Sequence, residues 1–365
     1  MKKAKKQLRR RILNKFGRKV SSRKIRGSIK HSNLKRKSPW RSRKMLPEIR
    51  VIAPSAIDFY KPKLFEKTNA FINELQQQIR SAYHNGKPHI RICFRNTHLI
   101  TAAAAINLFA ETSRTLKRCP GLSFSVTPPP TTLVNGQRKS PLPVVETVLN
   151  RLGFYELLGL PKRKMRELPN VSCWHQTSGF EVDGQLAASI LNKVQDTGIQ
   201  SSLLYRSGIE AVANAVEHAY SEQIMSDADI SLKTWWMFVA ILDGKLVLLV
   251  CDLGHGIPNT LEKTQAPAVL EAIWKLLGTK ATYDCQLIQA STLVKQTRTR
   301  LNNRGKGGKD LTSLVDKYPG SQLVIISNKG LYRYKDTSNI RKMFGTGYDH
   351  KSAINGTIIE WSIKL

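Results

Sequence analysis

Two apolar runs joined by two residues constrain the fold of this chain more than any other feature of its sequence. The runs span residues 234–242 and 245–251, and Asp243 and Gly244 lie between them. An Asp-Gly step between two apolar runs is a strong signal of a β-hairpin. We therefore expect an antiparallel pair of strands in the C-terminal half of the chain.

The segments on either side of this hairpin predict a domain of strands and helices over residues 171–365. Besides the hairpin, the expected strands are residues 173–182, 323–327 and 356–363. The expected helices are residues 184–195, 201–220, 266–277 and 310–317. Strands and amphipathic helices within one segment indicate an α/β domain in which helices cover a sheet.

A second α/β domain is predicted over residues 47–163, where strands and helices alternate. The expected strands are residues 50–53, 90–94 and 122–126. The expected helices are residues 64–83, 101–117 and 144–158. Such alternation favours helices packed on a sheet, and the prolines at 128–130 together with residues 135–140 are expected to form a loop.

Residues 1–46 are predicted to form a disordered basic arm. Residues 1–44 contain 20 Lys or Arg and no Asp or Glu, which leaves +13 of the net charge of +33 to the rest of the chain. A segment with so much charge and so few apolar residues cannot bury enough surface to become ordered. The arm either binds the phosphates of DNA or RNA or is a solvated extension, while a membrane-surface helix and a transit peptide fit its composition less well.

Three further features indicate a cytoplasmic protein that is not bound to a membrane. No apolar run reaches the roughly 20 residues that a membrane-spanning helix needs. The basic N-terminus is not followed by the apolar segment of a secretory signal. The five cysteines are scattered and form no CxxC pair, which favours a reducing compartment.

The expected helix 201–220 has a polar face of unusual composition. At about 100° per residue, Glu210, Asn214, Glu217 and His218 fall within roughly one quadrant. An apolar stripe that includes Val212 adjoins this quadrant, so the helix can pack by one face and present carboxylates, an amide and an imidazole on the other. Considered alone, the polar face fits either a binding site or a solvated surface.

Two glycine-containing turns follow this helix. Asp252 leaves the second hairpin strand into a Gly-x-Gly step, and glycine lets the backbone approach a ligand closely. Residues 303–311 form a glycine-rich turn that opens a helix, where free N–H groups and the helix dipole favour phosphate. Each turn by itself also fits an ordinary loop.

Taken in this order, the motifs resemble the GHKL superfamily of ATP-binding domains, which includes DNA gyrase and the histidine kinases. Glu-x-x-x-Asn-Ala-x-x-His at 210–218 is similar to its N box, and Asp-x-Gly-x-Gly-Ile at 252–257 to its first glycine box. The turn at 305–308 resembles the second glycine box, and Gly356-Thr357 the closing Gly-Thr. The resemblance covers residues 171–365 and implies a two-layer α/β sandwich with a mixed sheet covered by helices.

The resemblance implies Mg²⁺ and ATP as ligands and a role for each matched residue. Asn214 would ligate Mg²⁺, Asp252 would accept the adenine amino group, and Thr357 would support that contact. Glu210 would be a general base, and His218 would either touch a phosphate or structure its helix. The remaining cofactor-binding residues are Gly254, Gly256, Ile257, Gly305, Lys306, Gly307 and Gly308.

Two parts of the matched region differ in how closely they follow the family. Gly254 and Gly256 would let the backbone reach the nucleotide, while Lys306 and its neighbouring glycines would cover the phosphates. Residues 259–304 would be a mobile lid over the site. In the family, apolar residues follow the second glycine box directly, whereas Lys309 and Asp310 intervene here.

Residues 95–103 resemble the segment of STAS domains that joins a strand to a helix through a polar turn. In anti-sigma factor antagonists this segment carries a phosphorylatable Ser or Thr, and Thr101 is at the corresponding position. Thr101 is therefore either a phosphate acceptor or simply the N-cap of the helix at 101–117.

These features leave three functions open. Residues 210–220 look most like the anti-sigma factor serine kinases, which predicts a serine/threonine kinase or regulatory ATPase whose partner is the STAS-like domain or a sigma-factor-like protein. An alternative is an ATP-gated protein that binds nucleic acid through residues 1–44, with little or no kinase activity. The third is an ATP-sensing interaction module without turnover.

Overall fold

The structure is a computed structural model of the chain, and it describes a defined set of residues. The described residues are 48–86, 89–129, 133–134, 137–138, 144–162, 171–220, 233–302, 311–335 and 345–365. The predicted basic arm at 1–46 and the glycine-rich turn at 305–308 lie outside them.

A seven-stranded sheet forms the centre of the C-terminal segment. Its order is β13-β12-β11-β14-β10-β9-β8, and every neighbouring pair is antiparallel. The strands are β8 (Val171–Gly179), β9 (Trp235–Leu242), β10 (Lys245–Asp252), β11 (Gln322–Ser327), β12 (Gly330–Lys335), β13 (Thr346–Asp349) and β14 (Thr357–Lys364). The expectation of a mixed sheet is wrong, because hairpins join β9 to β10 and β11 to β12, and β14 runs antiparallel to both of its neighbours.

The hairpin predicted from the Asp-Gly step is confirmed. Strands β9 and β10 pair from Lys245 opposite Leu242 to Asp252 opposite Trp235. Asp243 and Gly244 have φ values of 50° and 69°, the left-handed conformation that a two-residue turn of this kind requires. The strand ends lie within one residue of the expected ones.

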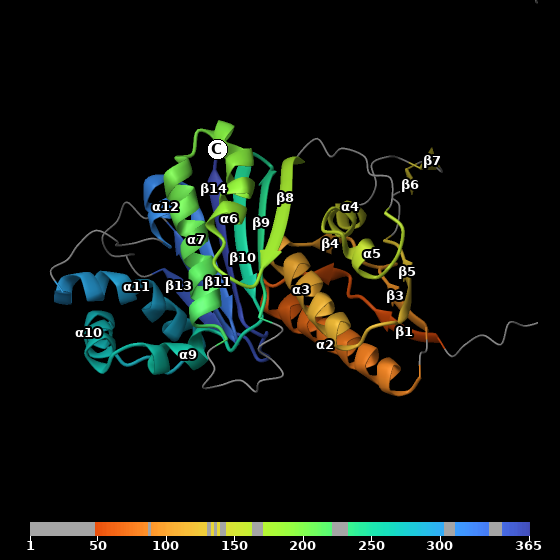
Figure 1. The fold of residues 1–365 in the computed structure, drawn as a ribbon, viewed down its shortest axis with the longest axis horizontal. Helices are drawn as coiled ribbons and strands as arrows, with labels where there is room; N and C mark the ends of the chain where they lie inside the picture. The colour runs from red at the N-terminus through yellow and green to blue at the C-terminus, as the bar shows by residue number, and fades with distance from the viewer. Residues whose placement is uncertain are drawn as a thin grey trace, which may run out of the picture. The chain divides into compact units, whose positions relative to one another are not determined.

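Helices cover one face of this sheet, which we call the front face. They are α6 (Gly184–Leu191), the 3₁₀ helix η1 (Asn192–Thr197), α7 (Ser201–Glu217) and α12 (Ser313–Lys317). Alternate strand residues, such as Met237 and Leu248, are buried against α6 and α7 in one apolar cluster. Figure 1 shows α6 and α7 lying along this side of the sheet.

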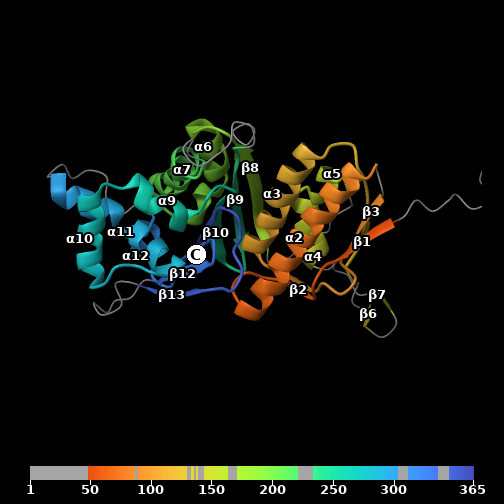
Figure 2. The same ribbon diagram turned by 90° about the horizontal axis from the view of Figure 1, so that it is seen from below.

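The opposite face, the back face, is covered by the N-terminal segment. The intervening strand residues, such as Phe238 and Leu249, share a buried cluster with residues of helices α2 (Pro62–His84) and α3 (Ala102–Arg118). Seen from below in Figure 2, α2 and α3 lie on the side of β9 and β10 opposite α6 and α7. Because both faces are buried, the central strands are apolar at nearly every position.

The N-terminal segment is an α/β unit, as predicted. Its three-stranded parallel sheet consists of β1 (Glu48–Ile52), β3 (His89–Cys93) and β5 (Ser123–Thr127), and a parallel pair joins β2 (Ala56–Ile57) to β4 (Leu99–Ile100). The expected helix 144–158 is divided into α4 (Val144–Arg151) and α5 (Phe154–Leu157) by Gly153, whose φ is 71°. A short hairpin, β6 (Leu133–Val134) with β7 (Gln137–Arg138), forms where we expected only a loop.

The two α/β segments pack together into one compact unit, Pro47–Leu365. The boundary that we predicted between them, at 163–171, falls mostly on residues outside the described ones. Across it, the side-chain amide of Gln176 in β8 donates a hydrogen bond to the carbonyl oxygen of Leu152 at 2.7 Å. The shared core means that the sheet and the N-terminal helices stabilise each other.

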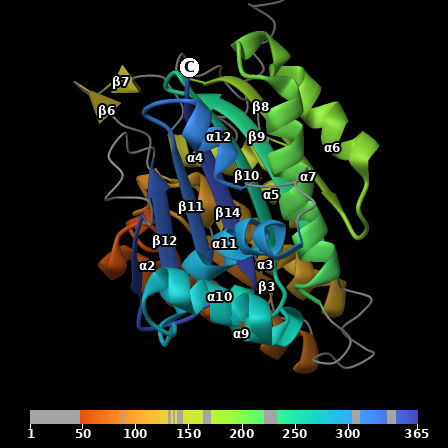
Figure 3. The ribbon, with the colours of Figure 1, turned by 90° about the vertical axis from the view of Figure 1, so that its left-hand side faces the viewer.

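Three helices follow β10 and precede α12, in the region where the sequence resemblance implied a lid at 259–304. They are α9 (Ile257–Thr264), α10 (Pro267–Leu277) and α11 (Asp284–Asn302), and Figure 3 shows them at one end of the sheet. Apolar residues such as Leu261, Ile273 and Leu293 form a separate small core among them. Within the described residues, no helix is long and apolar enough to cross a membrane.

Candidate functional site

A cavity of about 350 Å³ opens at the end of the sheet where β10 ends and β14 begins. Its walls come from α7, α9, α11 and these strand ends. This volume is within the usual range of small-molecule sites. Seven residues predicted for the site line it, namely Glu210, Asn214, His218, Asp252, Gly256, Ile257 and Thr357.

Helix α7 contributes the polar wall of the cavity. Glu210, Asn214 and His218 follow one another at intervals of about one helical turn and all line the cavity. The side-chain nitrogen of Asn214 donates to a carboxylate oxygen of Glu210 at 3.4 Å. A carboxamide binds a cation through its oxygen, and this contact holds the Asn214 amide by its nitrogen. The His218 side chain is 40% exposed and lies 3.9 Å from the Glu217 carboxylate.

The ends of β10 and β14 form a second part of the lining, and β11 ends beside β14. Asp252 ends β10 and is the register partner of Thr357, the first residue of β14. Ser327 ends β11 and is the partner of Thr357 on its other side. Asp252 alternates with Leu248 and Val250, which pack on α7, so its side chain belongs to the front face. The antiparallel order therefore brings three separate segments to one point.

Asp252 is a buried carboxylate with only 6% of its surface exposed. One of its oxygens accepts a hydrogen bond from the backbone nitrogen of Gly254 at 2.8 Å. Burial raises the pKa of Asp252 to about 7, although hydrogen bonds from the backbone of Gly254 and Thr357 and the charge of Arg114 oppose this rise. A ligand that donates a hydrogen bond here would favour the ionised form.

The glycines around Asp252 are required by close backbone approaches. A Cβ on Gly254 would lie 2.2 Å from the carbonyl oxygen of Ala219, the residue that follows α7 closely, and one on Gly356 would lie 2.2 Å from the carbonyl oxygen of Asp252. Gly256 has a φ of 81°, and its Cβ would lie 2.4 Å from the Asn328 side chain. Gly254 does not line the cavity, so its need for glycine comes from contact with the end of α7 rather than from a ligand.

Ser327 is a functional candidate that the sequence analysis missed. Its hydroxyl oxygen accepts from the backbone nitrogen of Ile257 at 2.9 Å and lies 2.9 Å from the hydroxyl oxygen of Thr357. It also donates to the carbonyl oxygen of Gly356 at 3.0 Å. The only sequence signal is a polar residue at the end of an apolar strand, which does not reveal that this strand lies beside β14.

Tyr220 is a second missed residue, and it fastens the chain after α7 to the Asp252 turn. Its buried hydroxyl donates to the carbonyl oxygen of Thr234 at 2.8 Å and accepts from the backbone nitrogen of Leu253 at 2.9 Å. Burial raises the pKa of Tyr220 well above its usual value, so the hydroxyl keeps its proton. The helix and the turn are thus held in a fixed relation.

The described lining of the cavity is acidic. Gly305, Lys306, Gly307 and Gly308, predicted to cover phosphates, lie outside the described residues. The described lining contains the carboxylates of Glu210, Glu217 and Asp252 but no Lys or Arg. Among the residues that the structure describes, no group of three His, Cys, Asp or Glu side chains could hold a metal ion. A cation beside Asn214 would therefore need further oxygen atoms to coordinate it, supplied by the bound small molecule and by water.

Thr101, the possible phosphate acceptor, is the N-cap of α3, but its side chain makes no capping hydrogen bond. Its hydroxyl oxygen is buried and has no hydrogen-bond partner in the structure. At 1.5 Å per residue, it lies about 20 Å along α3 from Arg114, which contacts the Asp252 turn. Phosphorylation of Thr101 remains a prediction, and it would require this hydroxyl to become exposed.

No model of a known protein family and no curated protein matches this chain. The functional interpretation therefore depends on the geometry of the cavity. That geometry provides a buried carboxylate for a hydrogen-bond donor at one end. At the other end it provides an amide oxygen and a carboxylate one helical turn apart on α7.

Proposed function

We propose that this protein binds Mg-ATP in the cavity, in the manner of GHKL domains. One observation carries the proposal. Residues from three separate parts of the sequence, around 210–218, 252–257 and 357, line one cavity of ligand size. Their order along the chain and their residue types are those on which the resemblance to GHKL domains rests.

The base end of the proposed site is built around Asp252. The exocyclic amino group of adenine would donate to its buried carboxylate, and Thr357 and Ser327 would hold the neighbouring strand ends in place. A hydrogen bond to a charged, buried group contributes about 1.5–3 kcal/mol. Removing the charge of Asp252 is therefore expected to weaken binding strongly.

The phosphate end of the proposed site depends on Mg²⁺. The oxygen of Asn214 would hold the ion, with Glu210 fixing the orientation of the amide through its contact with the amide nitrogen. When bound, Mg²⁺ would neutralise phosphate charge beside a wall that is itself acidic. The chain would add positive charge from Lys306, which lies outside the described residues.

Calorimetric titration with ATP, with and without Mg²⁺, tests this proposal. We expect binding that depends on Mg²⁺ and that falls about 10- to 100-fold in Asp252→Asn. Asp243→Asn makes the same chemical change in the turn of the same hairpin, away from the cavity, and should bind normally. Full affinity in Asp252→Asn would overturn the assignment.

For turnover, we propose a serine/threonine kinase of the anti-sigma type or a regulatory ATPase, with Glu210 as general base. This rests on the position of Glu210 in the cavity wall beside Asn214. ATP labelled at its γ-phosphate should label a protein, either at Thr101 or on a separate STAS-like partner, or release labelled phosphate. Glu210→Gln should abolish turnover and retain ATP binding, whereas Glu217→Gln should retain both. Undiminished turnover in Glu210→Gln would exclude this role.

A nucleic-acid-binding function is the second candidate, favoured by the 20 basic residues among the first 44. Each phosphate contact releases counterions, so binding through the arm would weaken steeply with salt. Deleting residues 1–44 should flatten that salt dependence. Nucleic-acid binding that is unchanged by the deletion would show that residues 1–44 do not bind the nucleic acid.

A further inference from the structure

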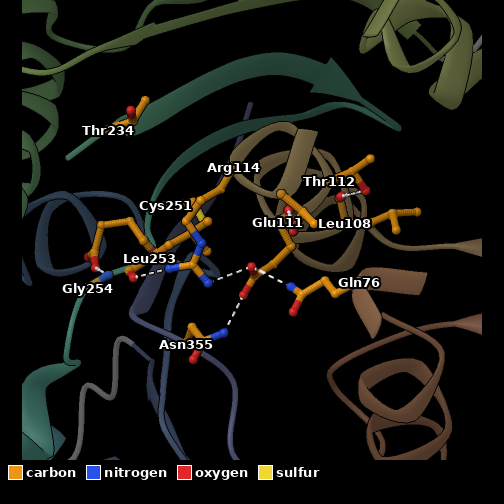
Figure 4. A network of polar contacts seen from close by, with 12 residues as sticks. Gln76, Leu108, Glu111, Thr112, Arg114, Thr234, Cys251, Leu253, Gly254 and Asn355 are labelled. Atoms are coloured by element: carbon orange, nitrogen blue, oxygen red, sulfur yellow. Dashed lines mark hydrogen bonds and ion pairs between the residues drawn. The ribbon is translucent and has the colours of Figure 1, made fainter. Parts of the chain in front are cut away.

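Helix α3 of the N-terminal segment holds both backbone segments that carry the base end of the cavity. The guanidinium of Arg114 donates to the carbonyl oxygen of Leu253, directly after Asp252, at 2.8 Å. The carboxylate of Glu111 accepts from the side-chain nitrogen of Asn355 at 2.7 Å. Asn355 precedes Gly356 and Thr357, so one turn of α3 contacts the end of β10 and the start of β14 (Figure 4).

These two contacts belong to one buried network. Arg114 and Glu111 form an ion pair at 2.7 Å, and Gln76 of α2 donates to the same Glu111 oxygen at 2.6 Å. Glu111 is only 2% exposed, and each of its two carboxylate oxygens accepts a hydrogen bond. A buried charge with a complete set of partners tolerates little displacement, because losing any one of them leaves an uncompensated polar group.

We propose that Arg114 and Glu111 are positioning residues of the nucleotide site, through which the N-terminal segment sets the preference for a base that carries an amino group. The inference rests on the proposed function, since it concerns the same cavity. Neither residue lines the cavity, and both act from the back face of the sheet. A partner that displaces α3 would thereby alter recognition of the base.

The charge of Arg114 gives this positioning a second consequence. Arg114 lowers the pKa of Asp252, and the backbone N–H groups of Gly254 and Thr357 act in the same direction. Among the described residues, Glu210, Glu217 and His218 line the same cavity, and the Tyr220 and Cys251 side chains interact electrostatically with Asp252. Burial raises the pKa values of both, so they remain neutral near pH 7. Loss of Arg114 would therefore leave Asp252 protonated to a higher pH and less able to accept from an amino group.

The test compares the affinities for ATP and inosine triphosphate over a range of pH. The two ligands carry the same triphosphate, but the base of inosine triphosphate has a carbonyl oxygen where adenine has its amino group. We expect Arg114→Met to lower the ratio of ATP to inosine triphosphate affinity about tenfold and to move the pH midpoint of that ratio upward. Arg114→Lys, which retains the charge, should keep the midpoint, and Asn355→Ala should lower the ratio by a smaller factor.

Gln176→Ala is the matched control, because it removes a different hydrogen bond between the same two segments, at β8. It should leave both the ratio and the midpoint unchanged. A wild-type ratio and midpoint in Arg114→Met would overturn the inference. If Arg114→Met does not fold, an unchanged ratio in Asn355→Ala would do the same. If the wild-type protein binds neither ligand, the proposed function itself fails.

Discussion

The two faces of the seven-stranded sheet differ in where they place polar groups. On the front face, the centre is apolar against α6 and α7, and polar side chains gather at one end around Asp252 and the cavity. On the back face, buried charges lie at the contact with the N-terminal segment, where Glu360 accepts from the Tyr60 hydroxyl and Glu111 accepts from Asn355.

This difference indicates a division of tasks. The polar groups of the front face are concentrated where a ligand can reach them. On the back face, Glu111 and Glu360 have partners within the protein and specify how the N-terminal segment docks, because a buried polar group without its partner costs about 1–3 kcal/mol. Contacts on the back face thus help to position the residues around the cavity on the front face.

The largest expected effect is on the front face, at the contact between the Asp252 turn and the end of α7. Gly254→Ala would place a Cβ against the Ala219 carbonyl oxygen. We expect the free energy of unfolding to fall by about 2–3 kcal/mol, as in other overpacked sites, with loss of ATP binding. Urea denaturation measures this change. Gly121→Ala, where a Cβ meets nothing within 4 Å, should cost only about 1 kcal/mol. Equal effects would contradict the close packing inferred here.

The next effect concerns the buried acids of both faces and has a defined pH dependence. Burial raises the folded-state pKa of Glu360 to about 7, well above its usual value near 4.5. The stability linked to this raised pKa is fully present below about pH 4.5 and is lost as the pH rises through 7. We expect the free energy of unfolding to fall by about 3 kcal/mol over that range. Asp252, whose pKa is also raised to about 7, adds a second contribution of the same sign.

Glu360→Gln separates the two contributions. Glutamine can still accept from the Tyr60 hydroxyl but does not ionise, so the pH dependence from the back face should disappear while that from Asp252 remains. In Asp252→Asn the reverse should hold. Urea denaturation at several pH values measures both, and an unchanged slope in Glu360→Gln would show that the back-face acid is not the source.

The smallest expected effect is at Thr357. Thr357→Val removes the hydroxyl that lies beside Ser327 but keeps the shape of the side chain. We expect ATP affinity to fall by about three- to tenfold, the usual contribution of one neutral hydrogen bond, because the hydroxyl would no longer support the adenine contact at Asp252. Calorimetric titration measures this. Val247→Thr, at a buried back-face position, should instead affect stability and spare affinity.

The sequence predicted the local features of the fold well, because they depend on neighbouring residues. The Asp-Gly step determines the hairpin of β9 and β10, and the polar face of α7 follows from helical spacing. The resemblance to GHKL domains predicted that Asp252 and the polar face of α7 belong to one site, and both line the cavity. Asp252, Asn214 and Thr357 all line the cavity, as expected.

Features that depend on long-range pairing were not predicted. Nothing in the sequence near 322–327 or 357–364 indicates that β14 lies between β10 and β11, so the role of Ser327 was missed. Strands β12 and β13 were also missed. Helix α11 was missed because its sequence has only a weakly amphipathic pattern. Glu111 and Arg114 are more than 100 positions away in the sequence from the residues that they contact at the strand ends. No local sequence pattern reveals such contacts.

A crystal structure of the protein with a non-hydrolysable ATP analogue and Mg²⁺ would show whether the cavity binds the nucleotide. We predict the adenine amino group within hydrogen-bond distance of the Asp252 carboxylate and the Mg²⁺ ion beside the oxygen of Asn214. An analogue bound outside this cavity, or with its base at the α7 end and its phosphates at Asp252, would contradict the account.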